Sequence, residues 1–205
     1  MDKILPVIKP RGISTYDVIR EYKRKTGFTG KIGHAGTLDP FAEGVVLLLL
    51  GKTTKRFDEI RAWDKVYLAG IRLGEVSTTG DPEGKITSVS SKKPTKKEIE
   101  KVIKMFIGET EQRIPAYSAA KHKGTPLYKL ARQGKAIPEK SKQIHIKKIE
   151  FVKYEYPELT IRVTCAGGTY IRQLAQDIGE QLKTGAFLYY LNREAVGKFD
   201  KGDSL

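Results

Sequence analysis

The sequence predicts a single α+β domain built on a mixed, largely antiparallel sheet that is flanked by helices. Three observations lead to this prediction. The 205 residues suffice for one large domain with a full hydrophobic core. Segments with strand-like alternation are interspersed irregularly with amphipathic helical segments. No repeat with a period of about 20–50 residues is visible, which argues against a solenoid or a propeller.

Two helices have well-defined beginnings and ends in the sequence. Ser14 is followed three residues later by Asp17, which is a capping arrangement, and Gly27 stands where a C-terminal cap belongs. Thr95 and Glu98 form a second capping box, and we expect the helix after it to end at Gly108. The apolar stripes are Val18, Ile19 and Tyr22 in the first helix and Ile99, Val102, Ile103 and Phe106 in the second.

Two more helices are predicted in the second half of the chain. Residues 127–133 form a short basic helix that ends at Gly134. Two glycines at 167–168 interrupt a strand, and Thr169 then caps a helix that runs towards Leu182.

Strands are predicted from the alternation of apolar and polar residues. Lys65–Leu73 is one such strand, and Leu159–Cys165 is a second, half-buried strand. The continuous apolar run Val45–Leu50 predicts a strand that is buried on both faces. Residues 86–95 are predicted to form a surface connection.

Charge and composition exclude several classes of protein. The chain has 38 basic and 24 acidic residues, a net charge of +14 that favours a polyanionic partner. Cys165 is the single cysteine, which excludes internal disulfides and cysteine-rich zinc sites. The longest apolar run is too short to span a bilayer, and the N-terminus has no signal-peptide core. We therefore expect a cytoplasmic protein without a membrane partner.

Nucleotide and metal chemistry are not supported by the motifs. Gly51-Lys52-Thr53 matches the end of a P-loop, but the preceding glycine, Gly44, leaves six intervening residues instead of four. The three histidines show no ligand spacing, and no nucleophile-elbow motif is present. The sequence thus predicts no metal site and no nucleotide-hydrolysing enzyme, while a Ser–His–Asp arrangement stays open. The histidines are His34, His122 and His145.

The positive charge is concentrated in one segment. Between Lys121 and Lys148 there are nine basic residues and one acid, Glu139, which gives a net +8. Tyr117 and Tyr128 lie beside or among these cations, which suits phosphate contact with base stacking. The segment predicts nucleic-acid contact, although a solvated basic surface is the simpler alternative.

Asp39 stands in a glycine-punctuated loop before Pro40. An isolated Asp-Pro pair usually caps a turn. A carboxylate beside a basic, RNA-sized surface can instead serve as a nucleophile or general base when a cation keeps it ionised. The residues by themselves therefore predict a basic RNA-binding α+β domain and leave its enzymatic activity open.

Residues 33–55, GHAGTLDPFAEGVVLLLLGKTTK, resemble the catalytic segment of the TruB family of tRNA pseudouridine synthases, in which a G-[AT]-L-D signature carries the catalytic aspartate. Further blocks similar to the family's motifs follow the family's order and cover essentially the whole chain. They are IKPRGIS (8–14), KVY (65–67), IPAYSAAK (114–121), LY (127–128), ARQG (131–134), GTYIR (168–172) and YLNR (190–193).

The resemblance implies a pseudouridine synthase fold and a set of active-site residues. Asp39 matches the catalytic aspartate, and Arg172 matches the arginine that pairs with it and holds the carboxylate ionised. Tyr67 matches the tyrosine that stacks on the target base and is a candidate proton acceptor. The remaining matches are Tyr170 and Leu191, which pack around the pocket, and His34, which helps to hold the RNA with its base extruded.

The resemblance also implies how RNA is bound. Residues 1–205 are expected to form one catalytic domain with a basic RNA-binding insertion around 115–148. The sequence ends at Leu205, so the family's small C-terminal RNA-binding domain is expected to be absent. The predicted RNA-binding residues are Lys9, Lys55, Lys121, Lys123, Lys129 and Arg132.

The implied reaction is the isomerisation of the T-loop uridine, position 55 of tRNA, to pseudouridine without a cofactor. The expected partner is the T-stem-loop of tRNA, with no guide RNA, and the expected state is a monomer. Whether Asp39 attacks the sugar, attacks the base or abstracts a sugar proton stays open. The alternative function is a non-catalytic RNA-binding or RNA-chaperone protein on the same fold.

Overall fold

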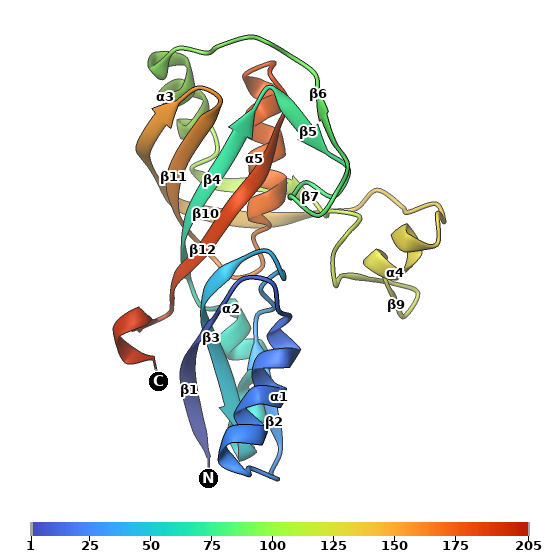
Figure 1. The fold of residues 1–205 in the computed structure, drawn as a ribbon, viewed down its shortest axis with the longest axis vertical. Coiled ribbons are helices and arrows are strands. Elements are labelled where there is room, and N and C mark those ends of the chain that lie inside the picture. The colour runs from blue at the N-terminus through green and yellow to red at the C-terminus, as the bar shows by residue number, and fades with distance from the viewer. Residues whose placement is uncertain (1, 205) are drawn as a thin grey trace.

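The computed structural model describes residues 2–204, and within them a nine-stranded sheet lies between helices (Figure 1). The strands of the sheet are β1 (Lys3–Lys9), β2 (Ile32–Ala35), β3 (Glu43–Leu50), β4 (Lys65–Leu73), β7 (Gly108–Arg113), β10 (Ser141–Glu155), β11 (Glu158–Cys165), β12 (Ala186–Val196) and β13 (Phe199–Asp200). Two hairpins lie outside it, formed by β5 (Glu75–Ser77) with β6 (Ile86–Ser88) and by β8 (Lys121–His122) with β9 (Thr125–Pro126). The helices are α1 (Thr15–Thr26), α2 (Phe57–Ala62), α3 (Lys96–Lys104), α4 (Leu127–Arg132) and α5 (Ile171–Gln181), with 3-10 helices η1 (Gly51–Arg56) and η2 (Lys201–Asp203). No helix in this part of the chain is both long and apolar enough to cross a bilayer.

The sheet is mixed and largely antiparallel, as the sequence predicts. Its strand order is β1-β3-β12-β4-β11-β10-β7, with β2 paired to β3 and β13 paired to β12. Only β12 and β3 run parallel, and they pair at two positions, Asn192 with Glu43 and Arg193 with Gly44. This short pairing joins two halves of the sheet. One half contains β1, β2 and β3 and lies in the lower part of Figure 1, and the other contains β12, β4, β11, β10 and β7 and lies in the upper part.

The two capped helices begin as predicted. Ser14 and Thr95 are the N-caps of α1 and α3, and each forms a capping box with the residue three positions later. Gly27 ends α1 in the left-handed conformation, with φ 67°. Helix α3 ends at Lys104, earlier than predicted, because the chain turns there to enter β7 at Gly108.

The predicted cap of α5 is wrong. Tyr170, not Thr169, is the N-cap residue, and it provides no side-chain cap. The Thr169 hydroxyl donates instead to the carbonyl oxygen of Ala166, 3.0 Å away, which closes the glycine-containing turn before the helix. The side chain of Gln112 from β7 accepts the Tyr170 backbone N–H at 2.8 Å, so a contact distant in sequence fixes the start of the helix.

The strand predicted from the apolar run is β3, and it is buried on both faces. Val46, Leu48 and Leu50 belong to the main core, whereas the alternate residues belong to a second core with Ile60 of α2 and Val196 of β12. Strand β4 has the predicted bounds, and β11 begins one residue earlier.

Several strands were not predicted. The missed members of the sheet are β1, β2, β7, β10, β12 and β13, and β6 lies inside the predicted surface connection. Strand β10 escapes pattern recognition because its pairing with β11 shifts register twice, after Ile146 and after Phe151. Each shift breaks the two-residue period on which prediction depends.

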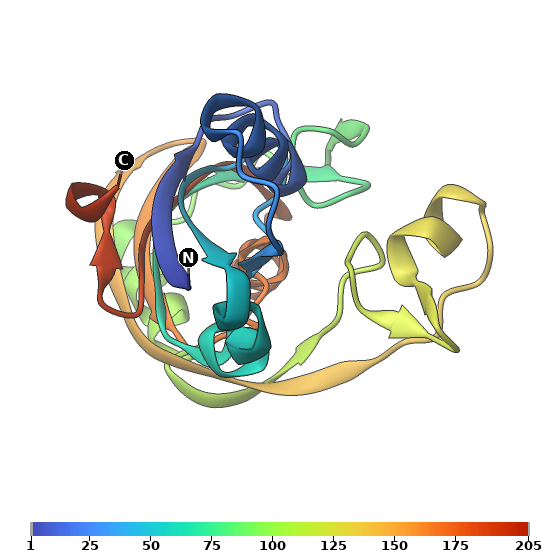
Figure 2. The same ribbon diagram turned by 90° about the horizontal axis from the view of Figure 1, so that it is seen from below.

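Residues 114–140 form a separate projection, which we call the basic lobe. It contains the β8–β9 hairpin and α4, and it stands apart from the sheet in both Figure 1 and Figure 2. The predicted insertion extended to residue 148, but residues 141–148 are the first half of β10 in the central sheet. The basic lobe therefore ends at about residue 140.

Candidate active site

Asp39 lies in the loop that connects β2 to β3, and several hydrogen bonds hold this loop. The Thr15 hydroxyl of α1 donates to the carbonyl of Leu38 and accepts the Leu38 N–H, both at 3.0 Å. The N–H of Gly12 donates to the carbonyl of Pro40 at 2.8 Å. The backbone on both sides of Asp39 is thus fixed by the first helix and by the segment that precedes it.

Lys9 is fully buried at 0% exposure, which corrects its prediction as a surface contact for RNA. Its ammonium donates to the carbonyls of Pro10, Ile13 and Pro40 at 2.9, 2.8 and 3.2 Å. Burial lowers the pKa of Lys9 to about 8. Lys9 therefore supports the turn that carries Asp39, and its charge does not face solvent.

Arg172 of α5 forms the ion pair with Asp39 that the resemblance implies. The distance from Arg172 Nε to Asp39 Oδ2 is 2.9 Å, and the arginine side chain is only 7% exposed. The guanidinium also donates to the carbonyls of Thr79 and Tyr117 at 2.9 and 2.7 Å. Arg172 thus connects the candidate catalytic carboxylate to the loop after β5 and to the base of the basic lobe.

Asp81 is a second carboxylate on the same arginine, and the sequence analysis missed it. Its Oδ2 lies 3.2 Å from Arg172 Nη1, and its side chain is 5% exposed. The Thr79 hydroxyl and the N–H of Glu83, at 3.1 Å, donate to its Oδ1. The Asp81-Pro82 turn gives no sequence signal for this role, because the ion pair spans distant parts of the chain.

Two carboxylates share one guanidinium, so Asp39 is not an easily ionised group. Burial raises the pKa of the Asp39 carboxyl above its ordinary value, Arg172 opposes the rise, and Asp81 adds to it. The resemblance implies that Arg172 keeps the carboxylate ionised. In the structure the arginine limits the rise in pKa but does not reverse it.

Tyr67 lies on β4 with 7% of its surface exposed. Burial raises the pKa of its phenol, and Arg193 on the neighbouring strand opposes that rise. The phenol is therefore protonated at neutral pH. Acceptance of a proton would first require loss of its own, so stacking on a base is the simpler role for this side chain.

The other predicted residues lie at different depths. Tyr170 is half-buried, and the Lys142 ammonium lies 4.1 Å from its ring centroid. Leu191 is a core residue at 5% exposure. His34 on β2 is half-buried, and its Nδ1 has no hydrogen-bond partner within residues 2–204; burial lowers its pKa, so it is neutral at pH 7.

The predicted RNA-binding cations do not form one cluster. Lys55 is exposed on η1, at the opposite end of β3 from Asp39, which corresponds to about 25 Å along the strand. The remaining four are exposed in the basic lobe, and the Arg132 guanidinium lies 5.7 Å from the centroid of the Tyr128 ring. These four residues are Lys121, Lys123, Lys129 and Arg132.

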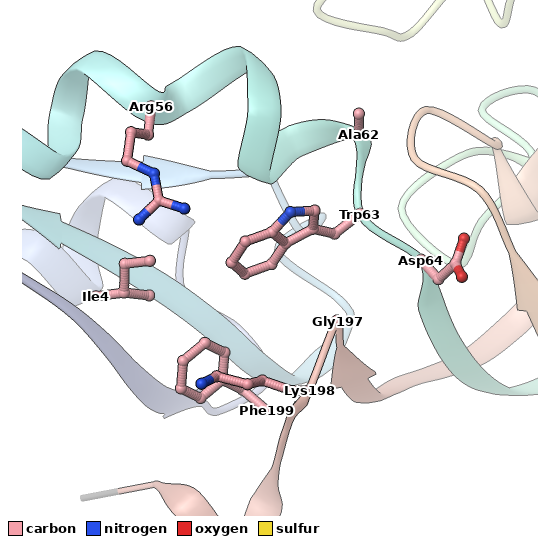
Figure 3. A pocket seen from close by; sticks show the side chains of 8 residues that line it. All are labelled: Ile4, Arg56, Ala62, Trp63, Asp64, Gly197, Lys198 and Phe199. Carbon is pink, nitrogen blue, oxygen red and sulfur yellow. The ribbon is translucent and has the colours of Figure 1, made fainter.

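Two hollows lie on the surface, one at the base of the basic lobe and one beside α2 and β13. One of about 360 Å³ lies between the base of the basic lobe and α5, and its lining includes Thr79 and Tyr117, whose carbonyls bind Arg172. The other, of about 650 Å³, is lined by Trp63 and Phe199, whose rings stack with centroids 6.4 Å apart (Figure 3). None of the predicted site residues lines the second hollow.

Comparison with known proteins gives the family. A family model described as TruB family pseudouridylate synthase, N-terminal domain, matches residues 23–171. The chain belongs to the TruB family. Membership of this family of pseudouridylate synthases makes the TruB chain an enzyme of the isomerase class.

Curated relatives of this TruB chain carry one common name. The protein called tRNA pseudouridine synthase B from Clostridium acetobutylicum is 43% identical over 205 residues, covering 100% of this chain and 71% of its own. The protein of that name from Endomicrobium trichonymphae is 42% identical over 206 residues, covering 100% of this chain and 89% of its own. The protein of that name from Nitratidesulfovibrio vulgaris is 45% identical over 193 residues, covering 93% of this chain and 62% of its own.

Solved structures share the fold of the TruB chain. The crystal structure of a Cbf5-Nop10-Gar1 complex contains a chain that superposes with a TM-score of 0.75 at 27% identity. The superposition covers 97% of this chain and 50% of the other. This chain therefore spans about half the length of its structural neighbour, and the shared half contains the sheet that carries Asp39 and Tyr67.

Proposed function

We propose that this protein isomerises the T-loop uridine at position 55 of tRNA to pseudouridine, with Asp39 as the catalytic nucleophile or base. The observation that carries the proposal is the Asp39–Arg172 ion pair, at 2.9 Å, in a chain that resembles tRNA pseudouridine synthases B over its full length. It acts as a monomer on the T-stem-loop itself, without a guide RNA.

The proposed reaction needs no redox partner and no co-substrate. The C1′–N1 bond of the uridine breaks, the uracil turns, and C5 bonds to C1′. C5 then loses its proton and N1 gains one, directly or by exchange with solvent, so the atoms balance. Asp39 assists the cleavage, by attack on the sugar or the base or by removal of a sugar proton. Arg172 orients the carboxylate with two N–H groups, Nε at 2.9 Å and Nη2 at 3.4 Å.

The base must leave its stack before it reaches Asp39, which costs a few kcal/mol. Stacking on an aromatic ring contributes roughly 1–3 kcal/mol per base in the opposite direction. We assign this role to Tyr67, which is 7% exposed on β4 and whose phenol is protonated. We assign Tyr170 and Leu191 to the surroundings of the bound base. His34 lies on the strand that leads into the Asp39 loop, and we assign it to holding the extruded nucleotide.

The basic lobe supplies the electrostatic attraction for the RNA backbone. Its four predicted RNA-binding cations are exposed, and none of them forms an ion pair with a carboxylate of residues 2–204. Release of counterions from RNA phosphates would therefore drive association. The lobe is attached to the site through the Tyr117 carbonyl, which Arg172 binds at 2.7 Å.

Pseudouridine formation in an unmodified T-stem-loop RNA tests the proposal. We expect product from the wild-type protein without cofactor or guide RNA. We expect no product from Asp39→Asn, although this variant should bind the RNA as tightly as wild type. Asp58→Asn, an exposed carboxylate on α2, is the matched control and should keep full activity.

Two results would contradict the proposal. Absence of product with both the stem-loop and full-length tRNA, despite tight binding, would leave the non-catalytic RNA-binding function. Equal turnover by Asp39→Asn and wild type would remove Asp39 from the mechanism. Gel filtration with light scattering, in the presence and absence of RNA, tests the monomeric state.

A further inference from the structure

The candidate active site is assembled from both halves of the sheet. Asp39 belongs to the half formed by β1, β2 and β3, whereas Tyr67 lies on β4 in the other half. The strand pairing between the halves covers only two residue pairs, in which Asn192 and Arg193 of β12 face Glu43 and Gly44 of β3. A pairing this short does little to fix the distance between the two side chains, so other contacts across the junction must contribute.

The side chain of Arg193 supplies such contacts. It is 1% exposed, and its Nε donates to the carbonyl of Val45 at 2.7 Å. Its Nη2 donates to the carbonyl of Gly36 at 3.1 Å. Both acceptors lie in the other half of the sheet, one on each side of Asp39 in the sequence, so one guanidinium holds the two ends of the segment that carries the carboxylate.

The backbone also approaches closely at this point. A Cβ added to Gly44 would lie 2.3 Å from the carbonyl oxygen of Arg193 and 2.7 Å from its nitrogen. Gly44 has a φ of 116°, in the region that favours glycine. Only glycine at position 44 therefore permits the close contact of β3 with β12 that brings the guanidinium to its acceptors.

Arg193 differs from an ordinary member of a buried ion pair. Among the described residues no carboxylate forms an ion pair with Arg193, whose hydrogen-bond acceptors are neutral carbonyl oxygens. An apolar side chain would avoid the cost of burying this charge but would leave the Val45 and Gly36 carbonyls without these donors. Lys65, another buried cation on the same sheet, bonds only to nearby carbonyls, those of Arg61 and Trp63, and so has a purely local role.

Arg193 also lies next to Tyr67. The register of β12 and β4 places the two residues directly opposite each other. In an antiparallel pair, opposite residues project to the same face of the sheet and their side chains are neighbours. One side chain thus stands beside the phenol and holds the backbone on both sides of the carboxylate.

We propose that Arg193 is a positioning residue that sets the separation between the Asp39 carboxylate and the Tyr67 phenol by tying the two halves of the sheet together. This inference rests on the proposed function, since the separation matters only if both groups act on one nucleotide. Loss of the Arg193 hydrogen bonds to the Val45 and Gly36 carbonyls should slow the chemical step. RNA affinity should be unchanged, because it depends on the basic lobe.

Kinetics of Arg193→Lys and Arg193→Met on T-stem-loop RNA test the proposal. We expect kcat to fall about 100-fold in the methionine variant, as for a small misplacement of reacting groups. KM and the Kd for RNA should change little, and lysine should restore part of kcat. Arg162→Lys is the matched control, because its partner Glu194, 2.8 Å away, lies in the same half of the sheet.

Hydrogen–deuterium exchange supplies a readout that does not need activity. Backbone amides of residues 36–45 should exchange faster in both Arg193 variants than in wild type, while those of β11 stay protected. If the wild-type protein makes no pseudouridine, the proposed function fails. The exchange experiment then still tests whether Arg193 holds residues 36–45 in place.

Two outcomes would overturn the assignment. One is unchanged exchange of residues 36–45 together with unchanged kcat per folded molecule. The other is a loss of kcat that merely follows the folded fraction measured by thermal unfolding. If the methionine variant does not fold, the lysine variant alone decides between these outcomes and the expected one.

Discussion

The basic lobe and the candidate active site both contain several cations, but their side chains have different surroundings. In the lobe, cations such as Lys123 and Lys129 are exposed and form no ion pair with the rest of the described chain. At the site, Lys9, Arg172 and Arg193 are buried, and each binds two or more backbone carbonyls.

This difference separates two uses of positive charge. An exposed cation attracts a polyanion at long range and loses that effect as salt increases. A buried cation with several fixed acceptors organises backbone segments that are distant in sequence. Substitutions in the lobe should therefore change RNA affinity, and substitutions at the site should change turnover.

Among the substitutions that test this difference between buried and exposed cations, the largest effect is expected for Arg172→Met. The substitution removes the ion pair to Asp39 and the hydrogen bonds to the Thr79 and Tyr117 carbonyls together. We expect single-turnover pseudouridine formation to fall on the order of 100-fold or more, because the carboxylate loses its orientation. RNA affinity, measured by filter binding, should stay within a few-fold of wild type. An equal loss of affinity and rate would contradict the separation of the two regions.

The second effect concerns the lobe. Replacing its four predicted RNA-binding cations by glutamine should weaken RNA binding steeply and reduce the slope of log K against log[salt] by up to about 0.7–0.9 for each phosphate that the lobe no longer neutralises. The single-turnover rate at saturating RNA should be retained. The four substitutions are at Lys121, Lys123, Lys129 and Arg132.

A charge-matched control isolates the role of location. Neutralising four exposed lysines outside the lobe changes the net charge by the same amount and should leave the salt slope nearly unchanged. A similar decrease in both variants would mean that only overall charge matters. The control positions are Lys85, Lys97, Lys101 and Lys104.

A smaller effect is a gain in stability from Asp39→Asn. Because the folded-state pKa of Asp39 is raised, its ionised form destabilises the fold, and this cost develops as pH rises through that pKa. Removing the charge should raise Tm at neutral pH. The difference should vanish in acid, where the carboxyl is protonated in both the folded and the unfolded chain. A lower Tm at neutral pH would show that the ion pair with Arg172 outweighs burial.

The last effect is a pH dependence from Lys9. Its folded-state pKa is lowered to about 8, so between that pH and its ordinary value of 10.5 the unfolded chain binds more protons than the folded one. The free energy of unfolding should therefore gain a rising contribution over this range. Denaturant titrations of Lys9→Met should lack the contribution, whereas Lys123→Met in the lobe should retain it.

Local patterns were sufficient for parts of the fold. The capping boxes at Ser14 and Thr95, the left-handed Gly27 and the bounds of β4 were predictable because each depends on residues a few positions apart. The double burial of β3 followed from an uninterrupted apolar run. These features can be predicted from the conformational propensities of neighbouring residues and from the spacing of apolar residues along the chain.

Parts of the site were not predictable in this way. Asp81 shares Arg172 with Asp39, and Lys9 is buried instead of exposed, although neither has a distinctive local pattern. Strand β10 was hidden by its register shifts and its lysines. In each case the outcome depends on which distant group lies within hydrogen-bonding distance.

The sequence by itself determined the α+β class, the capped helices, the doubly buried strand, the net charge and the aspartate on which the proposed chemistry depends. Only the tertiary structure decided that Arg172 serves two carboxylates, that Lys9 supports a turn, and that Arg193 spans the junction between the two halves of the sheet. The physical reason is that helix caps and strand periods arise from neighbouring residues. The partners of a buried charge are instead set by the packing of segments that lie far apart in the sequence.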